Sequence, residues 1–214
     1  MALLNEEVRE QVTEALSGLE SAVRLVGFTK PEDCPYCSII VELMEEVASC
    51  SDQVSVEIYD FTQDAAQVAE FNIDKAPAIA IVGAEDYGLR FFGVPAQHEF
   101  GTLIHGIQAV GHGHAHLDDE TLSYLSTLDQ EVNLRVFVTP GCPHCPGAAT
   151  LAFDMALASP HVYAEIVEAG EFQELSNQFN VMGVPLSVVN ERERVEGRAP
   201  ADMIVDAIEA ALTA

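Results

Sequence analysis

The sequence predicts an α/β protein built from two tandem copies of one structural unit. A Cys-x-x-Cys motif occurs twice, as CPYC at residues 34–37 and as CPHC at residues 142–145, with an offset of 108 positions. The same offset brings Pro77 onto Pro185 without a gap. In both copies strand-like runs alternate with helical patterns, which is typical of layered α/β folds. Such a repeat decides the architecture before any single motif is interpreted.

The elements of the first copy follow from local patterns. Apolar residues three or four positions apart predict helices, and short β-branched or aromatic runs predict strands. The expected order is helix 4–19, strand 22–29, helix 38–48, strand 54–60, helix 65–72, strand 78–82, strand 89–93 and a helix over about 96–110.

The second copy repeats this order, and a Gly- and His-rich connector at residues 111–116 separates the two. We therefore expect one unit over residues 1–113 and another over 114–214. The expected elements of the second copy are helix 118–128, strand 132–139, helix 149–158, strand 162–168, helix 172–180, strand 186–189, strand 193–197 and a helix over about 199–213.

The charge balance excludes some classes of partner. Asp and Glu number 35 against 9 Lys and Arg, which gives a formal net charge of -26 over 214 residues. Such a surface repels nucleic-acid phosphates and anionic lipid head groups, so neither nucleic acid nor a membrane is an expected partner. The first residues lack a basic start and a long apolar run, which favours a cytoplasmic protein.

Three kinds of site compete for the cysteine pairs. Zinc ribbons place a second pair about 15–20 residues after the first, far closer than the two pairs here. A purely structural disulfide over so small a loop stabilises little, because its entropic contribution grows with loop length. A low cysteine count, five in this chain, is also typical of catalytic or metal-binding cysteines in a reducing compartment.

Redox chemistry explains the placement of each pair between a strand and a helix. Unpaired N–H groups and the helix dipole favour a thiolate at a helix N-terminus, where the proline of the motif also fits. That thiolate attacks a disulfide, and the second cysteine then displaces the mixed disulfide. His144 stabilises a neighbouring thiolate better than Tyr36 does, so we expect Cys142 to have the lower thiol pKa and its pair the higher reduction potential.

Pro77 and Pro185 form the second half of the pattern. Each begins a strand-like run 43 positions after the first cysteine of its copy. A proline at this place indicates a special turn, and we expect cis peptide bonds at Ala76–Pro77 and Val184–Pro185.

Together these residues resemble the thioredoxin and glutaredoxin fold. CPYC is similar to glutaredoxin motifs, and CPHC is similar to those of strong disulfide oxidants. With "FVTPGCPHCP", "FNVMGVP" and "GVPAQHEF", the chain resembles the glutaredoxin-like protein disulfide oxidoreductases of archaea and thermophilic bacteria. The resemblance covers nearly the whole chain.

The resemblance implies two thioredoxin-like units that share a mixed central sheet flanked by helices. Cys34 and Cys142 would be the nucleophiles, and Cys37 and Cys145 the resolving thiols. The cis prolines, with Ala76 and Val184 before them, would shape the substrate grooves. Family members reduce, oxidise and isomerise protein disulfides in the cytoplasm, maintain its redox balance and receive electrons from a thioredoxin reductase-like flavoprotein. No cofactor or metal is then required, because the cysteines carry the electrons.

The sequence also departs from the thioredoxin pattern. Neither strand before a motif carries the buried acid that handles the proton of the resolving cysteine. Glu32 and Asp33 directly precede Cys34, and their charge should raise the pKa of that thiol. We therefore expect the C-terminal site to dominate.

Two alternative functions are also compatible with the motifs. The chain could relay electrons from a flavoprotein to a peroxidase, or bind zinc or an iron–sulfur cluster through Cys34 or Cys142. The connector histidines, His112, His114 and His116, are better explained as a solvated linker than as a metal site. Cys50 has no partner in the second copy and is expected to be a small buried residue.

Overall fold

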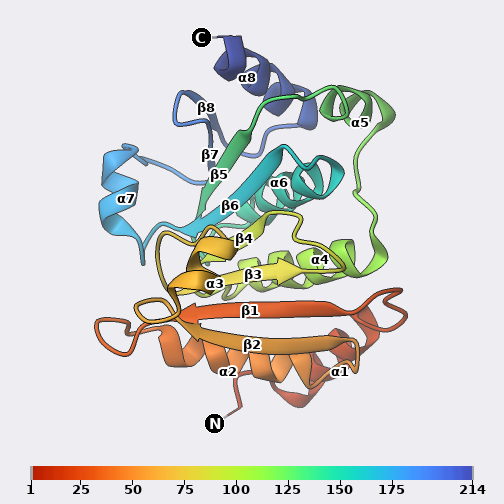
Figure 1. Ribbon diagram of the computed structural model, residues 1–214, viewed down its shortest axis with the longest axis vertical. Helices are drawn as coiled ribbons and strands as arrows, with labels where there is room; N and C mark the ends of the chain where they lie inside the picture. The colour runs from red at the N-terminus through yellow and green to blue at the C-terminus, as the bar shows by residue number, and fades with distance from the viewer. Residues whose placement is uncertain (1, 214) are drawn as a thin grey trace.

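The computed structural model describes residues 2–213 and confirms the mixed α/β architecture, with one central sheet flanked by helices (Figure 1). The N-terminal half contains α1 Glu6–Ala15, β1 Val23–Thr29, α2 Cys37–Ala48, β2 Val54–Asp60, α3 Ala65–Glu70, β3 Ala78–Val82, β4 Leu89–Phe92 and α4 His98–His112. The C-terminal half contains α5 Asp119–Leu125, β5 Val132–Val138, α6 Cys145–Ala158, β6 Val162–Glu168, α7 Gln173–Gln178, β7 Leu186–Val189, β8 Glu193–Glu196 and α8 Ala201–Thr213.

A single eight-stranded sheet runs through both halves in the order β2-β1-β3-β4-β6-β5-β7-β8. Within each half the first two strands pair in parallel and the other neighbours pair antiparallel. The halves join through parallel β4 and β6, in a register that runs from Leu89 opposite Ala164 to Phe92 opposite Val167. The repeat in the sequence is therefore a repeat of topology.

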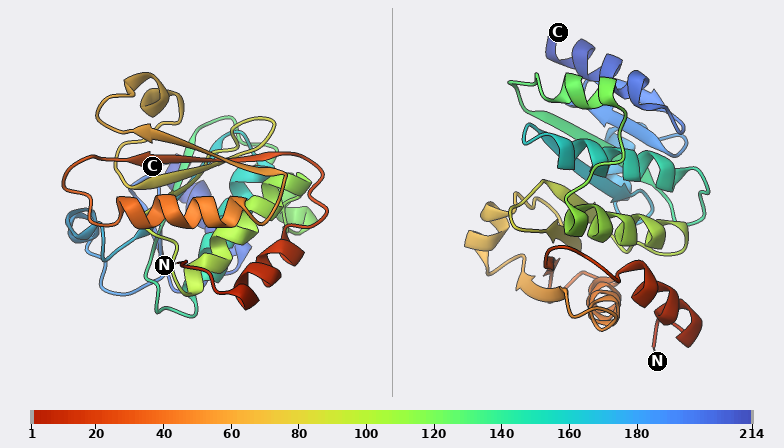
Figure 2. Two further views of the ribbon diagram at one scale, coloured as in Figure 1. Left: turned by 90° about the horizontal axis from the view of Figure 1, so that it is seen from below. Right: turned by 90° about the vertical axis from the view of Figure 1, so that its right-hand side faces the viewer.

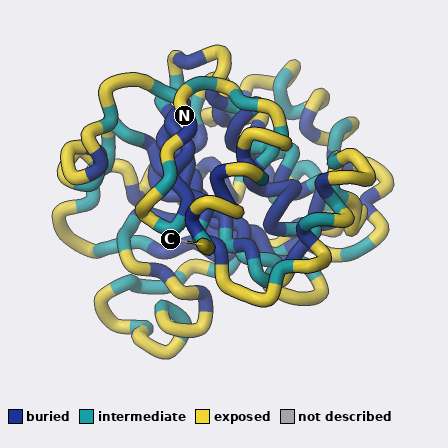
Figure 3. The backbone as a smooth tube through the Cα atoms, turned by 90° about the horizontal axis from the view of Figure 1, so that it is seen from above, coloured by how far each residue is buried: buried dark blue, intermediate teal, exposed yellow. Residues whose placement is uncertain are grey.

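Along each strand, buried apolar residues are divided between two cores, because successive side chains point to opposite faces of the sheet. On β1, Val23 and Leu25 enter the larger core under α1, α2, α4, α6 and α8, while Val26 and Phe28 enter a smaller core with α3 and α7. Figure 2 shows the larger helices gathered on one side of the sheet and α3 on the other. Seen from above, the buried backbone lies in the middle, and exposed segments surround it (Figure 3). No helix within residues 2–213 combines the length and apolar composition that crossing a lipid bilayer requires.

Helices α4 and α6 cross closely at the seam between the halves, and Gly106 permits this approach. A Cβ added at Gly106 would lie 2.6 Å from Ile81 Cδ1 and 3.2 Å from two ring carbons of Phe153. Both neighbours are fully buried, so neither has free space to move into. The absence of a side chain at Gly106 therefore allows α4 to pack close to α6, the helix that begins at Cys145.

Two helices are shorter than the sequence predicted, by four residues or more. The expected helix 4–19 is α1, whose N-cap Asn5 accepts a hydrogen bond from Val8 N–H and which ends before Gly18 at φ +78°. The expected helix 118–128 ends at Leu125, because the hydroxyls of Ser126 and Thr127 donate to carbonyls of its last turn. Polar side chains that bond to the backbone compete with continuation of a helix.

Two glycines of α4 give a stability prediction for the seam. Gly106→Ala should lower the free energy of unfolding by about 1 kcal/mol, because overpacking outweighs the gain in helix propensity. Gly101→Ala, where no described atom lies within 4 Å of an added Cβ, should raise it by roughly 0.5–1 kcal/mol. Urea unfolding monitored by circular dichroism measures both, and changes of the same sign would contradict the packing at the seam.

Candidate active sites

Each cysteine pair forms a disulfide at the carboxyl end of a strand. We call the Cys34–Cys37 pair site 1 and the Cys142–Cys145 pair site 2; their Cα atoms are 5.4 and 5.5 Å apart. Strand β1 leads to site 1 and β5 to site 2, and these strands occupy equivalent places in the two halves. The two pairs do not meet in a shared four-ligand arrangement, because β3, β4 and β6 lie between β1 and β5 in the sheet.

The second cysteine of each pair is the first residue of a helix. Cys37 begins α2 and Cys145 begins α6, with Tyr36 and His144 as their N-caps. The first cysteines lie three residues earlier, just before the N-terminus of each helix, and the helices begin earlier than the expected 38–48 and 149–158. Proline does occupy the first turn of α6, but it is Pro146, after the motif.

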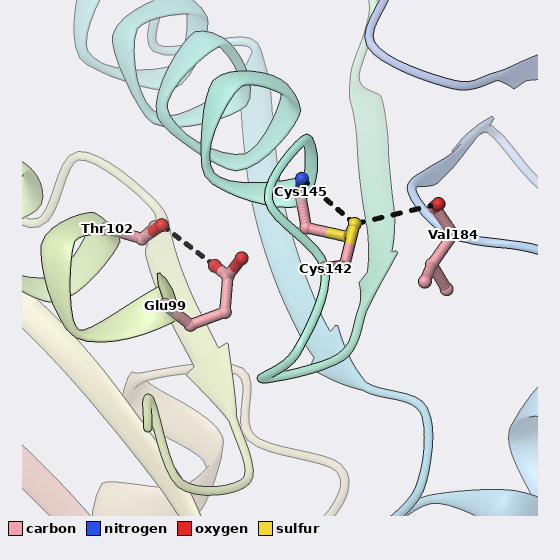
Figure 4. The surroundings of a disulfide bond; sticks show 5 residues. All are labelled: Glu99, Thr102, Cys142, Cys145 and Val184. Carbon is pink, nitrogen blue, oxygen red and sulfur yellow. Dashed lines mark hydrogen bonds between the residues drawn. A yellow bond between two sulfur atoms is a disulfide. The ribbon is translucent and has the colours of Figure 1, made fainter. Parts of the chain in front are cut away.

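Site 2 brings three parts of the C-terminal half together (Figure 4). Backbone N–H of Cys145 donates a hydrogen bond of 3.2 Å to Cys142 Sγ. The same sulfur lies 3.7 Å from the carbonyl oxygen of Val184, and the Val184–Pro185 peptide bond is cis. The Cys142 sulfur therefore lies between the first N–H of α6 and the residue before the cis proline, and the expected cis bond is confirmed.

Site 1 has the same parts in a looser arrangement. Four residues separate β1 from Cys34, whereas three separate β5 from Cys142, and the extra length is taken up where Asp33 has φ +54°. Lys30 N–H donates 3.2 Å to Cys37 Sγ, and the Ala76–Pro77 bond is cis. Cys34 is only partly buried, whereas Cys142 is 8 % exposed. The roles of these residues toward a substrate stay predictions.

Tyr36 and His144 both face solvent beside their disulfides. Tyr36 is 42 % exposed, and His144 is exposed as well. Neither makes a side-chain capping hydrogen bond to its helix. Each side chain is thus available to act on the neighbouring sulfurs, and their expected tuning of thiol pKa stays a prediction.

A buried acid that the sequence reasoning missed lies beside site 2. Glu99 is fully buried in the first turn of α4, where Thr102 Oγ1 donates 2.8 Å to its Oε2 while Oε1 has no hydrogen-bond partner among residues 2–213. Burial raises the pKa of Glu99 to about 7, although the hydrogen bond from Thr102 opposes the shift. Figure 4 shows its carboxylate on the side of α4 that faces the Cys142–Cys145 disulfide.

The helical spacing of buried residues in α4 could have pointed to Glu99. Glu99 shares the buried stripe of α4 with Leu103, Gly106 and Val110, at a position where an apolar residue is expected. Glu99 belongs to the N-terminal half, so the strand that precedes the site 2 motif gives no indication of it. Within the described chain, site 1 receives no equivalent from α8, which packs against α5, β7 and β8 at the opposite edge of the sheet.

The connector histidines and Cys50 lie outside both sites. The rings of His114 and His116 are 5.2 Å apart, and His116 is 5.7 Å from His105 of α4. Within residues 2–213 no group of three or more His, Cys, Asp or Glu side chains is arranged to hold a metal ion. Cys50 is a free, partly buried cysteine whose Sγ lies 3.4 Å from the carbonyl oxygen of Glu46.

The thioredoxin family model matches the second half of the chain. Residues 132–210 match the family model of the thioredoxin domain. This segment runs from β5 to α8 and contains site 2 with its cis proline. The expected resemblance to the thioredoxin fold is confirmed there.

Whole-chain relatives are distant in sequence. The chain is 26 % identical over 208 residues to an alkyl hydroperoxide reductase subunit of Escherichia coli, and the match covers 97 % of this chain and 38 % of that protein. It is 22 % identical to an NADH dehydrogenase of Bacillus subtilis, over 95 % of this chain and 37 % of that protein. The chain therefore spans less than two fifths of the length of these curated relatives.

Solved structures match both halves together. A protein disulfide oxidoreductase from Aeropyrum pernix has a TM-score of 0.90 and 25 % identity, over 98 % of this chain and 94 % of that one. The NTD_N/C domain of alkylhydroperoxide reductase AhpF from Enterococcus faecalis has a TM-score of 0.89 and 24 % identity, over 96 % and 99 %. The expected resemblance to protein disulfide oxidoreductases with two joined units is thereby confirmed.

The buried acid predicts how stability depends on pH. The pKa of Glu99 is raised from 4.5 to about 7, so the folded chain binds a proton that the unfolded chain has lost between these values. Stability should therefore fall as pH rises from about 4.5 through 7, by a total on the order of 3 kcal/mol. Glu99→Gln should remove this contribution to the fall, because the amide does not titrate.

Urea unfolding of the oxidised chain at pH 5, 6, 7 and 8 measures the effect. Glu171→Gln is the matched control, since burial, with the nearby charge of Glu168, raises the pKa of Glu171 to about 6. That variant should remove the separate contribution of Glu171, which is complete by about pH 6, and keep the fall that Glu99 causes up to about pH 7. Parallel pH curves for the parent and Glu99→Gln would contradict the burial of an ionisable Glu99.

Proposed function

We propose that this thiol–disulfide oxidoreductase of thioredoxin-like fold exchanges disulfides with protein substrates at two sites, and that site 2 carries most of the activity. The observation that supports this most strongly is the convergence at site 2 of the sulfur pair, the N-terminus of α6, the cis proline and the buried acid. Site 1 has the first three parts without the acid.

The cysteines carry the reaction. For reduction, the Cys142 thiolate attacks one sulfur of the substrate disulfide, which forms a mixed disulfide and releases the other substrate sulfur as a thiolate. Cys145 then loses its proton and attacks Cys142 Sγ, which closes the Cys142–Cys145 disulfide and releases the second substrate sulfur. Two electrons pass to the substrate, and oxidation is the same sequence in reverse. Cys34 and Cys37 play these parts at site 1.

Glu99 is the proton acceptor that we propose for Cys145. Cys145 is fully buried, so its thiol has no bulk water to receive the proton. A carboxyl group with a pKa of about 7 accepts and returns a proton near neutral pH with little free-energy cost in either direction. Oε1 of Glu99, unpartnered within the described chain, leaves one acceptor atom available for this step.

The segments before the cis prolines would hold the substrate. Val184 already has its carbonyl oxygen beside the Cys142 sulfur, and Ala76 occupies the matching place before Pro77. A substrate strand laid along Val184 and Pro185 would place its own disulfide next to Cys142, and one along Ala76 and Pro77 would do the same at site 1. Extended peptides bind sheet edges and loops in this way through main-chain hydrogen bonds.

The wider setting is part of the proposal. We place the chain in the cytoplasm, where it would reduce, oxidise and isomerise protein disulfides and contribute to redox homeostasis. A flavoprotein of the thioredoxin reductase type would supply electrons, and the disulfides would need no further cofactor. A boundary between residues 113 and 114 is supported by Gly113, which caps α4 in a left-handed conformation before the irregular connector.

A relay of electrons from a flavoprotein to a peroxidase is the second candidate. It is supported by the match of nearly the whole chain to 38 % of a protein named for hydroperoxide reduction. In that case the protein would be a carrier between fixed partners. Reconstitution with a flavoprotein donor and a thiol peroxidase, compared with insulin as acceptor, would rank the two candidates by rate.

Single cysteine variants test the proposed function. With dithiothreitol as donor, Cys142→Ser should slow insulin reduction at least about tenfold, because it removes the dominant nucleophile. Cys34→Ser should slow it no more than about twofold. Equal losses would contradict the dominance of site 2, and full activity without Cys142 and Cys34 would contradict redox chemistry at the pairs.

A swap of the residues between the cysteines tests the tuning of the two sites. His144→Tyr should lower the reduction potential of site 2 by about 30 mV, a tenfold change in equilibrium, because it removes stabilisation of the thiolate. Tyr36→His should raise that of site 1 in the same sense. Glutathione redox titration, with alkylation and mass spectrometry of each pair, measures both potentials, and unchanged values would refute the assignment.

A further inference from the structure

The segment that leads to Pro77 is joined to the C-terminal half by a buried ion pair. Lys75 Nζ lies 3.2 Å from Glu165 Oε2 on β6, and the two side chains are only 13 % and 7 % exposed. The same ammonium lies 3.6 Å from the ring centroid of Phe92 at the end of β4. Nζ also lies 2.6 Å from Oδ1 of the exposed Asp74, so the ammonium is held between its own segment and the C-terminal half, two residues before the cis proline of site 1.

Glu165 is held ready for this contact by its own half. Asn133 Nδ2 donates 2.6 Å to Oε1, and Arg135 Nε donates 2.9 Å to Oε2. Burial by itself would raise the pKa of Glu165, but the charges of Lys75 and Arg135 outweigh it and keep the pKa below its ordinary value. The side chain is therefore a carboxylate at neutral pH.

Further contacts support the same segment from the seam. The Tyr163 hydroxyl of β6 donates 3.0 Å to the carbonyl oxygen of Asn72, and Arg90 Nε of β4 donates 2.9 Å to that of Phe71. The stretch 71–77 is thus attached at its start by hydrogen bonds and near its end by the ion pair.

The corresponding segment of the C-terminal half has the arginine but a glycine in place of the lysine. Arg194 donates to the carbonyl oxygens of Phe179 and Asn180, as Arg90 does to Phe71. At the repeat offset, Lys75 corresponds to Gly183, around which no described atom lies within 4 Å of an added Cβ. The ion pair is therefore specific to site 1 and crosses between the halves.

We propose that Lys75 and Glu165 are positioning residues for site 1, which hold the Ala76–Pro77 segment where a protein substrate must lie beside Cys34. This inference rests on the proposed function. It makes the dependence of the two sites reciprocal, since site 2 takes Glu99 from the N-terminal half and site 1 takes Glu165 from the C-terminal half. The docked pair of halves is then the functional unit at both sites.

The test uses the full chain with Cys142→Ser and Cys145→Ser, so that only site 1 reacts. The single-turnover rate of the reduced protein is measured with insulin and with a small aryl disulfide, dithiobis(nitrobenzoate). Lys75→Met should lower the insulin rate about tenfold, as misplacement of a binding segment does, and leave the rate with the small disulfide within about twofold. Lys75→Arg, which keeps the charge, should restore most of the insulin rate.

Two controls separate positioning from general stability. Arg24→Met removes the ion pair of Arg24 with Glu57, whose side chains are 40 % and 34 % exposed, and should leave both rates unchanged. Lys75→Met in a chain that retains only site 2 should leave the insulin rate of site 2 unchanged. Glu165→Gln removes the ion pair from the other half, so it serves as the second variant if Lys75→Met does not fold.

The outcomes distinguish this inference from the proposed function. A parent that reacts with insulin at site 1, and a Lys75→Met variant that keeps this rate, would overturn the positioning role alone. Equal losses with insulin and the small disulfide, or at both sites, would also overturn it. A parent without any site 1 reaction toward insulin would remove the proposed function of site 1 and the positioning role with it.

Discussion

The parallel pairing of β4 with β6 is the constraint on which both sites depend. It turns two four-stranded halves into one sheet, and it satisfies backbone groups of two strands that would otherwise be exposed edges. On one face of the sheet the pairing brings α4 against α6, and on the other it brings Lys75 to Glu165. A separated half would keep its cysteines but lose a group that the structure supplies from its neighbour.

The same constraint makes the two sites unequal. If each copy stood alone, a repeat of topology would give two similar environments. In the joined sheet, α6 has α4 of the other half beside it, whereas α8, the equivalent of α4, packs against α5, β7 and β8 at the far edge. The second cysteine of the pair is fully buried at site 2 and 7 % exposed at site 1. The two sites therefore have different surroundings because the two copies are joined in a linear order within one sheet.

Much of this arrangement could be predicted from the sequence, because its signals are local or periodic. Two CxxC motifs and two prolines at one offset were enough to indicate the repeat, the fold and the cis bonds, which the structure has. Glu99 could not be assigned to site 2, because the site that it faces belongs to the other copy. The contact of Lys75 with Glu165 joins residues 90 positions apart across the same seam. Local sequence patterns therefore predict the fold of each unit. Contacts between the units depend on how the units pack, which these patterns do not contain.

Several of the few Lys and Arg residues lie at the seam, near β4 and β6. The chain has only 9 Lys and Arg against 35 Asp and Glu, so two acidic halves must dock against mutual repulsion. Three of these cations, Lys75, Arg90 and Arg135, have side chains 13 %, 1 % and 8 % exposed, and each pairs with an acid near β4 and β6. Arg90 pairs with Asp86 within the N-terminal half and Arg135 with Glu165 within the C-terminal half, whereas Lys75 pairs with Glu165 across the seam. A buried charge without a partner is costly, so a separated N-terminal half would lose this partner of Lys75. Three of the nine cations are thus buried near the pairing of β4 with β6, and one of them, Lys75, joins the two halves directly.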